Sequence, residues 1–225
     1  RFADVRSFEF DGEHLIDPSD GTIINAIYRR SVTSEILQHP GECDALIDAV
    51  AAGKVCLIGH FRTTVVHSKM VNVALFDPRT REFLTDEEWE FVQRHVPATY
   101  RLRRDTAGLD IEAVKANKDA WIIKPEDDYG ASGVFPGVDH TQEQWERLVN
   151  ENTDTCYIAQ EFYTPRTVDV ILPSDDECKV ESWQQMPGFY QYNGKICGFY
   201  VRLGQEGVIA LDHGGIIANS FKVDC

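Results

Sequence analysis

Lys124 stands where an apolar segment ends and a glycine-containing loop begins. The three residues before it, Trp121 to Ile123, favour a β-strand, and Pro125 should end the ladder of that strand because proline has no N–H donor. The chain then returns as a second strand that ends near Gly137. These residues predict a hairpin with Lys124 at the mouth of its loop.

Two glycines of this loop, Gly130 and Gly133, permit the positive φ angles and the close backbone approach of a loop that surrounds a ligand. A lysine at such a loop acts as a point charge for nucleotide phosphates, and free loop N–H groups supply further contacts. The segment 121–137 therefore predicts a phosphate-binding hairpin. An ordinary hairpin with a surface lysine has the same local pattern, so both interpretations stay open here.

A second segment, residues 157–162, consists of a buried strand that runs into the polar pair Gln160 and Glu161, followed by Phe162. The elements that position these two segments alternate between helix and strand. In the first part of the chain we expect a hairpin with a two-residue Asp11-Gly12 turn, a strand over 23–28, a helix that opens near Ser31 or Thr33, a helix over 44–52 and a strand over 54–58. A helix over 64–76 that carries Lys69 should follow, then a helix that begins with a Thr85–Glu88 capping box and ends by Pro97, and a polar crossing between two lobes over 98–108. The rest should form a helix over 109–118, a helix over 141–150 with a Thr141–Gln144 capping box, and a β-meander over 167–172, 179–192, 195–203 and 208–211 with an Asn193-Gly194 turn.

The composition excludes several classes of protein. The chain has 225 residues, of which 43% are hydrophobic, so it can bury a core, and its 22 basic and 37 acidic residues give a formal charge of −15. Nucleic acid and anionic membranes are therefore poor partners. No apolar run approaches the roughly 20 residues of a membrane span, and no signal peptide is seen. We expect a cytoplasmic protein, and because the sequence begins at Arg1 rather than Met, a piece of something longer.

Six cysteines are scattered without a C-x-x-C pair, and several lie in apolar runs. We expect reduced core cysteines and no zinc site. The patterns of P-loop, Rossmann, zincin, α/β-hydrolase and protein-kinase sites do not occur in the sequence.

In chain order, the strand with Lys124, the glycine loop, the helix near Trp145 and the strand that ends in Gln160-Glu161 resemble the nucleotide-binding half of ATP-grasp ligases. The whole set is similar to the circularly permuted branch typified by glutathionylspermidine synthetase and its uncharacterised bacterial relatives, with this chain as the C-terminal part. An N-terminal D-G hairpin followed by YRR, the Ser68-Lys69 pair and a late G-[FY]-x-x-R add to the similarity.

The resemblance implies an α+β fold of two α/β lobes around a nucleotide cleft, with lobes over 1–105 and 106–225. It implies an ATP-dependent carboxylate–amine ligase that forms an acyl phosphate from a small carboxylic acid and then joins it to an amine, with ATP and Mg²⁺ required. Its implied site residues are Lys69 and Lys124 on the phosphates, Tyr129, Gly130 and Gly133 in the loop, Gln160, Glu161 and Phe162 at the adenine hinge, and Arg202 as the residue that stabilises the transferring group.

The sequence departs from the family in two places. The family's metal-binding Asp and Glu-x-Asn lie upstream of the region seen here, so the metal ligands are expected outside this chain. The usual Gly-Gly-Lys-Gly of the loop is Gly130-Ala131-Ser132-Gly133. Two alternatives follow: a non-catalytic relative that binds nucleotide or a protein partner through the same cleft, and a kinase-like phosphotransferase. The acid, the amine and the oligomeric state are not specified by the sequence.

Overall fold

The structure, a computed structural model, describes residues 1–173 and 178–221. It is a mixed α+β protein with several small sheets, and its backbone contacts divide it into two compact units, Arg1–His67 and Ser68–Cys225. The boundary expected after residue 105 falls inside the second unit. No helix in the described ranges is long and apolar enough to cross a membrane.

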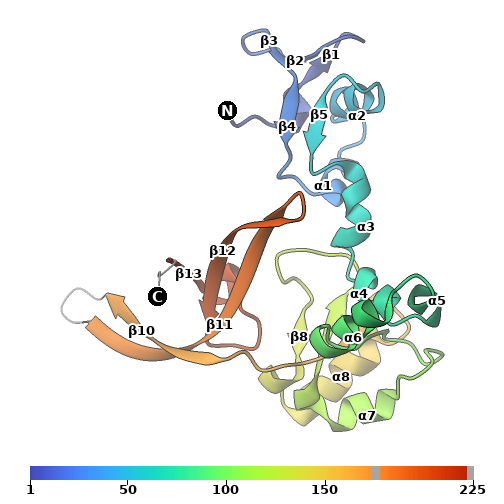
Figure 1. The fold of residues 1–225 in the computed structure, drawn as a ribbon, viewed down its shortest axis with the longest axis vertical. Helices are drawn as coiled ribbons and strands as arrows, with labels where there is room; N and C mark the ends of the chain where they lie inside the picture. The colour runs from blue at the N-terminus through green and yellow to red at the C-terminus, as the bar shows by residue number, and fades with distance from the viewer. Residues whose placement is uncertain (174–177, 222–225) are drawn as a thin grey trace. The chain divides into compact units, whose positions relative to one another are not determined.

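The first unit contains a three-stranded antiparallel sheet and a two-stranded parallel sheet (Figure 1). Leu15, Leu46 and Ala49 are fully buried in its core. The described elements of this unit are β1 (Glu9–Phe10), β2 (Leu15–Asp17), β3 (Thr22–Ile24), β4 (Ala26–Tyr28), α1 (Thr33–Leu37), α2 (Asp44–Ala51), β5 (Cys56–Ile58) and α3 (Thr64–His67).

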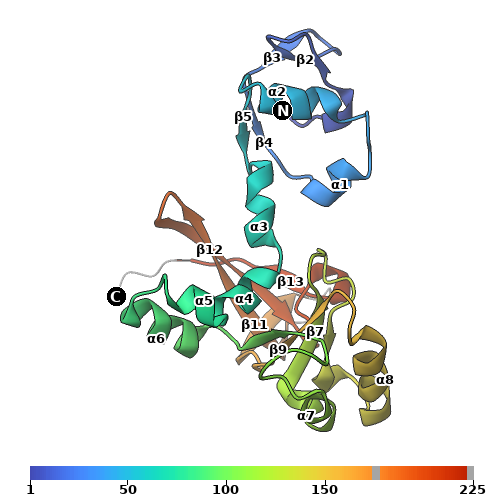
Figure 2. The ribbon, with the colours of Figure 1, turned by 90° about the vertical axis from the view of Figure 1, so that its right-hand side faces the viewer.

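The second unit begins with helices and then forms a four-stranded sheet in the order β6-β9-β7-β8. The helices α7 and α8 lie along one side of this sheet (Figure 2), and Trp145 of α8 donates its indole N–H to the carbonyl of Val114 in α7 over 3.0 Å. The described elements are α4 (Met70–Leu75), α5 (Pro78–Arg81), α6 (Asp86–His95), β6 (Thr99–Arg101), α7 (Ile111–Ala116), β7 (Trp121–Pro125), β8 (Phe135–Pro136), α8 (Gln142–Asn152) and β9 (Tyr157–Glu161).

The chain ends in an antiparallel sheet in the order β10-β11-β12-β13, with strands β10 (Thr167–Pro173), β11 (Cys178–Tyr192), β12 (Lys195–Gly204) and β13 (Ile216–Ala218). Asn193 and Gly194 have φ angles of 47° and 74°, as a type I′ hairpin turn requires, so the predicted turn is confirmed. The strand predicted over 208–211 is wrong, because a short 3-10 helix, Leu211–His213, begins at its end and the fourth strand follows.

The capping boxes of Thr85 with Glu88 and of Thr141 with Gln144 are both confirmed, and so are the hairpin of β1 and β2 and the strands β7 and β9. The first hairpin turns over four residues rather than two, because the side chain of Asp11 accepts the N–H groups of Glu13 and His14.

The single helix expected over 64–76 is wrong. The helix is interrupted at Ser68 and Lys69. The hydroxyl of Ser68 donates to the carbonyl of Glu126 over 3.1 Å, and the backbone N–H of Lys69 donates to the same carbonyl over 2.8 Å. The segment 98–108, expected as a crossing, contributes strand β6 to the sheet. Strand 23–28 is divided at Asn25 between β3 and β4.

The expectation of core cysteines holds for Cys43 alone among the described residues. Cys43 is buried, whereas Cys56, Cys156, Cys178 and Cys197 are exposed, and all five are free thiols. Cys225 lies outside the described ranges.

Candidate functional site

The loop between β7 and β8 has the positive φ angles that were predicted from its glycines. Gly130, Ala131 and Gly133 have φ angles of 68°, 62° and 66°, all in the left-handed region. A Cβ at Gly133 would lie 2.6 Å from the hydroxyl of Tyr157 and 3.0 Å from Cγ of Pro125. Gly133 is therefore required both by its φ angle and by the close approach of Tyr157, whereas Gly130 is required by its φ angle alone.

The sheet that carries this loop has one face covered by α7 and α8. Ile123 of β7 pairs with Ala159 of β9, and both are fully buried in the core with Val114 and Trp145. Because side chains alternate along a strand, Lys124 and Gln160 belong to the opposite face. On that face Gln160 pairs directly with Thr99 of β6.

A continuous chain of hydrogen bonds crosses this second face. Lys124 Nζ donates to Gln160 Oε1 over 2.7 Å, and Gln160 Nε2 donates to Thr99 Oγ1 over 2.8 Å. Thr99 Oγ1 in turn donates to the carbonyl of Pro97 over 2.9 Å. Both Gln160 and Thr99 are buried. The chain fixes the orientation of the glutamine amide and holds the lysine ammonium at the end of β7.

Burial, and to a smaller extent the positive charge of Lys69, lower the pKa of Lys124 to about 8. The hydrogen-bond acceptor that Lys124 has is a neutral amide, and among the residues that the structure describes no carboxylate forms an ion pair with it. A half-buried ammonium without a counter-ion is costly, and an anionic ligand would remove that cost.

Lys69 reaches the same loop from a distant part of the sequence. Its ammonium donates to the carbonyl of Asp128 over 2.9 Å, and its backbone N–H is held by the carbonyl of Glu126. Burial lowers the pKa of Lys69, while the nearby Asp128 and Asp127 act in the opposite direction. The break in the helix thus places a second ammonium close enough to Lys124 to affect its titration.

The acidic residues at the start of the loop are partly neutralised. The carboxylate of Glu126, which is mostly buried, pairs with Arg101 over 3.3 Å. The side chain of Asp128 accepts the N–H of Tyr129 over 2.7 Å. Burial raises the pKa of Tyr157, and the charge of Asp128 raises it further, so the Tyr157 hydroxyl stays protonated beside the loop.

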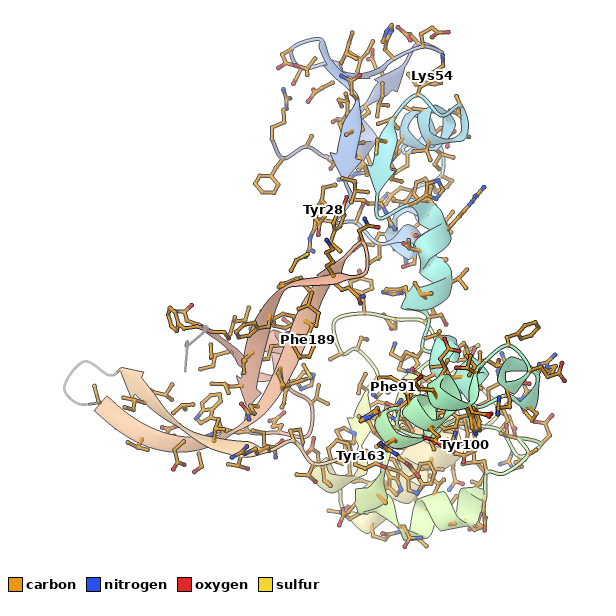
Figure 3. All side chains as sticks on the ribbon, in the orientation of Figure 1. Tyr28, Lys54, Phe91, Tyr100, Tyr163 and Phe189 are labelled. Carbon is orange, nitrogen blue, oxygen red and sulfur yellow. The ribbon has the colours of Figure 1, made fainter. Side chains whose placement is uncertain are left out.

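The predicted hinge lies at the end of β9. Glu161 accepts a hydrogen bond from Tyr163 over 3.1 Å and a longer one from the N–H of Ala98 over 3.3 Å, and Figure 3 labels Tyr163 just beyond the strand. The N–H of Phe162 donates to the carbonyl of Ala120 over 2.8 Å. Both groups therefore have partners within the protein.

Arg202 lies in the other sheet of this unit. It pairs with Met186 of β11 and Ile217 of β13, and its guanidinium carbon lies 5.2 Å from the ring centre of Tyr200, a cation–π contact. The structure thus brings Lys69, Lys124, Gln160 and the glycine loop together, and Arg202 is described only within its own sheet.

Sequence reasoning assigned no role to Thr99, which fixes the amide of Gln160, or to the hydroxyl of Ser68, which donates to the carbonyl of Glu126. It also gave no role to Tyr157, whose hydroxyl lies close to Gly133. A buried threonine opposite a buried glutamine is visible only once the register of β6 against β9 is known. No group of three or more His, Cys, Asp or Glu residues in the described ranges could hold a metal ion.

No protein-family model matches this sequence, and no curated protein matches it either. What bears on its function is therefore the set of contacts described above.

Proposed function

We propose that this chain is the nucleotide-binding part of an ATP-dependent carboxylate–amine ligase of the circularly permuted ATP-grasp type. One observation carries the proposal: Lys124 and Lys69 converge on a glycine loop, and Lys124 is half-buried with a neutral amide as its partner. A polyphosphate would supply the missing negative charge. Two ammonium groups form charge-assisted hydrogen bonds with a polyphosphate, and such bonds are stronger than those that a neutral ligand would accept.

The loop favours the same ligand. Its backbone takes the left-handed conformation at three positions, and successive backbone N–H groups in such turns form concavities that bind anions. Ala131 adopts this conformation although a non-glycine residue is strained there, which is typical of functional loops. The lysines would neutralise the phosphates, and the loop would enclose them.

The base of the nucleotide is assigned to Glu161 and Phe162 because Glu161 is the last residue of the strand that holds Gln160 and Phe162 follows it. In this assignment the N–H of Phe162 exchanges the carbonyl of Ala120 for an acceptor on adenine. A backbone donor and acceptor pair selects adenine over guanine, so ATP should bind and GTP should not. Equal affinity for the two nucleotides would contradict the assignment of the base to this hinge.

The reaction would proceed in two steps. A carboxylate oxygen of the acid forms a bond to the γ-phosphorus, and the bond from that phosphorus to the bridging oxygen breaks, releasing ADP. The amine nitrogen then attacks the acyl carbon, phosphate leaves with the bonding electrons, and the nitrogen loses a proton. Catalysis of this kind depends on positioning and on stabilisation of charge, to which Lys69, Lys124 and Arg202 would contribute.

Among the described residues no group of three or more His, Cys, Asp or Glu could hold a metal ion on its own. No step is therefore assigned to a metal on this chain. This favours activity in a longer protein that supplies the ligands. The same observation supports the second candidate, a non-catalytic relative that binds a nucleotide at Lys69 and Lys124.

Release of ADP separates these functions. In the longer protein, a ligase releases ADP only when Mg²⁺, a carboxylic acid and an amine are all present. A phosphotransferase yields a phosphorylated product without the amine, and a non-catalytic relative binds ATP with no release. Failure of this chain to bind ATP at all would contradict every version of the proposal.

A further inference from the structure

A groove of about 650 Å³ lies in the first unit, remote in sequence from the lysine site. Its walls are the N-terminal segment, residues 1–5, and the segment 22–31 that includes β3 and β4. In Figure 1 the strand β5 lies on one side of β4, and the first residues of the chain approach β4 from the other side. The groove therefore runs along the edge of β4 that β5 does not cover.

That edge of β4 offers backbone groups for pairing. The hydrogen bonds to β5 involve alternate residues, since Asn25 accepts from Cys56 and Arg29 donates to Ile58. By the alternation of a strand, the N–H and C=O groups of Ala26 and Tyr28 point to the opposite edge. Within the described part of the chain no backbone hydrogen bond to these groups is found. An open edge of this kind is a template for an added strand.

The two faces of the edge differ in chemistry. Val5, Phe8, Ile24 and Ile27 line the groove and pack against the core of the unit, so its floor is apolar. The side chains of Tyr28 and Arg30 point to the other face by strand alternation. Tyr28 is 70% exposed, and Figure 3 labels it at the end of β4. An added strand would thus meet apolar groups on one face and a cationic, exposed surface on the other.

The charge balance of the groove is positive, in a chain whose formal charge is −15. Both carboxylates of its lining are already paired, Asp4 with Arg6 and Asp17 with Arg1. Arg29 donates to the carbonyls of Gly59 and Ser31 over 2.7 and 2.6 Å, which leaves its charge uncompensated. In the described ranges no carboxylate pairs with Arg29 or Arg30. A strand that carries acidic residues complements this surface.

We propose that the groove between residues 1–5 and the open edge of β4 binds an extended peptide of alternating apolar and acidic residues as an added β-strand. The apolar side chains lie on the floor, and the acidic ones lie beside Tyr28 and Arg30. Main-chain hydrogen bonds to Ala26 and Tyr28 fix its register, as in other peptide sites built on sheet edges. This site is independent of nucleotide binding by the second unit.

The peptide Val-Glu-Val-Glu-Val-Glu-Val-amide, with a fluorescein label on its N-terminus, tests the proposal by fluorescence polarisation with the intact chain. The counterpart with lysine in place of glutamate should bind at least about tenfold more weakly, since its ammonium groups would lie beside the like charge of Arg30. Equal binding of the two peptides, or binding of neither, would overturn the proposal.

Methylation of the peptide backbone tests strand addition itself. The N–H groups of the valines point to one edge of the added strand, and those of the glutamates point to the other. One of the two N-methylated isomers, valine-methylated or glutamate-methylated, should therefore lose at least about tenfold in affinity while the other stays within about threefold of the parent. Equal behaviour of the two isomers would rule out an added strand.

Two further measurements locate the site and its occupant. Arg30→Glu should weaken the acidic peptide by about tenfold or more, whereas Arg62→Glu, the same change at an exposed arginine outside the groove, should alter affinity by less than about twofold. If both variants weaken binding equally, the peptide is attracted by the overall charge of the protein rather than by this groove, which would contradict the proposal. Light scattering that shows a dimer resistant to the peptide would assign the edge to a second copy and contradict the proposal.

Discussion

The ammonium of Lys124 is held by the side-chain amide of Gln160, 2.7 Å away, although a carboxylate at that position would stabilise the charge better. Gln160 is buried, and Thr99 fixes its orientation. The amide positions the lysine without neutralising it, and that leaves the positive charge available to an anion.

Replacement of this amide by a carboxylate should separate stability from binding. In Gln160→Glu, the new ion pair should raise the pKa of Lys124 and leave the melting temperature unchanged or higher, while ATP affinity falls by about tenfold or more because a like charge now faces the phosphates. Thermal unfolding and titration calorimetry measure the two effects. Gln144→Glu, the same change on the exposed first turn of α8, is the control. A variant that binds ATP as tightly as the native chain would exclude Lys124 as a phosphate contact.

The pKa of Lys124 predicts how binding depends on pH. The free protein holds this proton with a pKa of about 8, and a bound phosphate would raise that value. ATP affinity should thus be highest below about pH 8 and fall above it, by at most about tenfold per pH unit for one proton. Titrations between about pH 7 and pH 9.5 test this, and Lys124→Met should show a flatter dependence. Identical slopes for the native chain and the variant would contradict it.

Folding stability should depend on pH with the opposite sign to ATP affinity. Because folding lowers the pKa of Lys124 from its ordinary value of 10.5, the unfolded chain binds this proton more tightly than the folded chain. The contribution of Lys124 to folding stability should rise as the pH increases from about 8 to about 10.5. Urea unfolding of the native chain and Lys124→Met across this range measures it, and a difference between them that does not change with pH would contradict the burial of this ammonium.

The loop glycines should differ in their tolerance of substitution. Both have positive φ, for which an alanine costs about 1 kcal/mol, but Gly133→Ala also drives its Cβ into Tyr157 and Pro125. Gly133→Ala should lower the melting temperature more than Gly130→Ala, whose Cβ finds its nearest atom at 3.9 Å. In a Tyr157→Phe background the excess should shrink, because the hydroxyl that the Cβ meets is gone. Equal losses for both glycines would mean that the loop adjusts around Tyr157.

In a longer protein that contained this chain, Arg202 should affect turnover rather than nucleotide affinity. Its guanidinium lies over Tyr200 within a sheet, so it is held in place before any ligand binds. A fixed cation stabilises the charge that develops during transfer, so Arg202→Ala should change the ATP dissociation constant by less than about threefold and lower kcat by about 10² or more. Tyr200→Leu removes the ring but keeps the cation, and its effect should be smaller. Loss of affinity in proportion to rate would make Arg202 a ground-state ligand.

The parts of the fold that depend on local chemistry could be predicted from the sequence. The capping boxes, the Asn193-Gly194 turn and the hairpin around Lys124 are set by residues a few positions apart. The interruption of the helix at Lys69 could not be predicted, because its cause is a bond to Glu126, 58 residues from Ser68. Thr99 and Gln160 are 61 residues apart, and neither reveals the other without the sheet register.

The most direct test is a calorimetric titration of the chain with ATP, comparing the native protein with Lys124→Ala, Lys69→Ala and Lys195→Ala. The first two variants each remove a charge-assisted contact worth about 1.5–3 kcal/mol, so each should weaken ATP binding by about tenfold or more. Lys195 is exposed at the β11–β12 turn, so Lys195→Ala removes the same charge away from the site and should leave the ATP affinity within about twofold. Unchanged affinity in Lys124→Ala and Lys69→Ala, or equal losses in all three variants, would contradict a phosphate site at this loop.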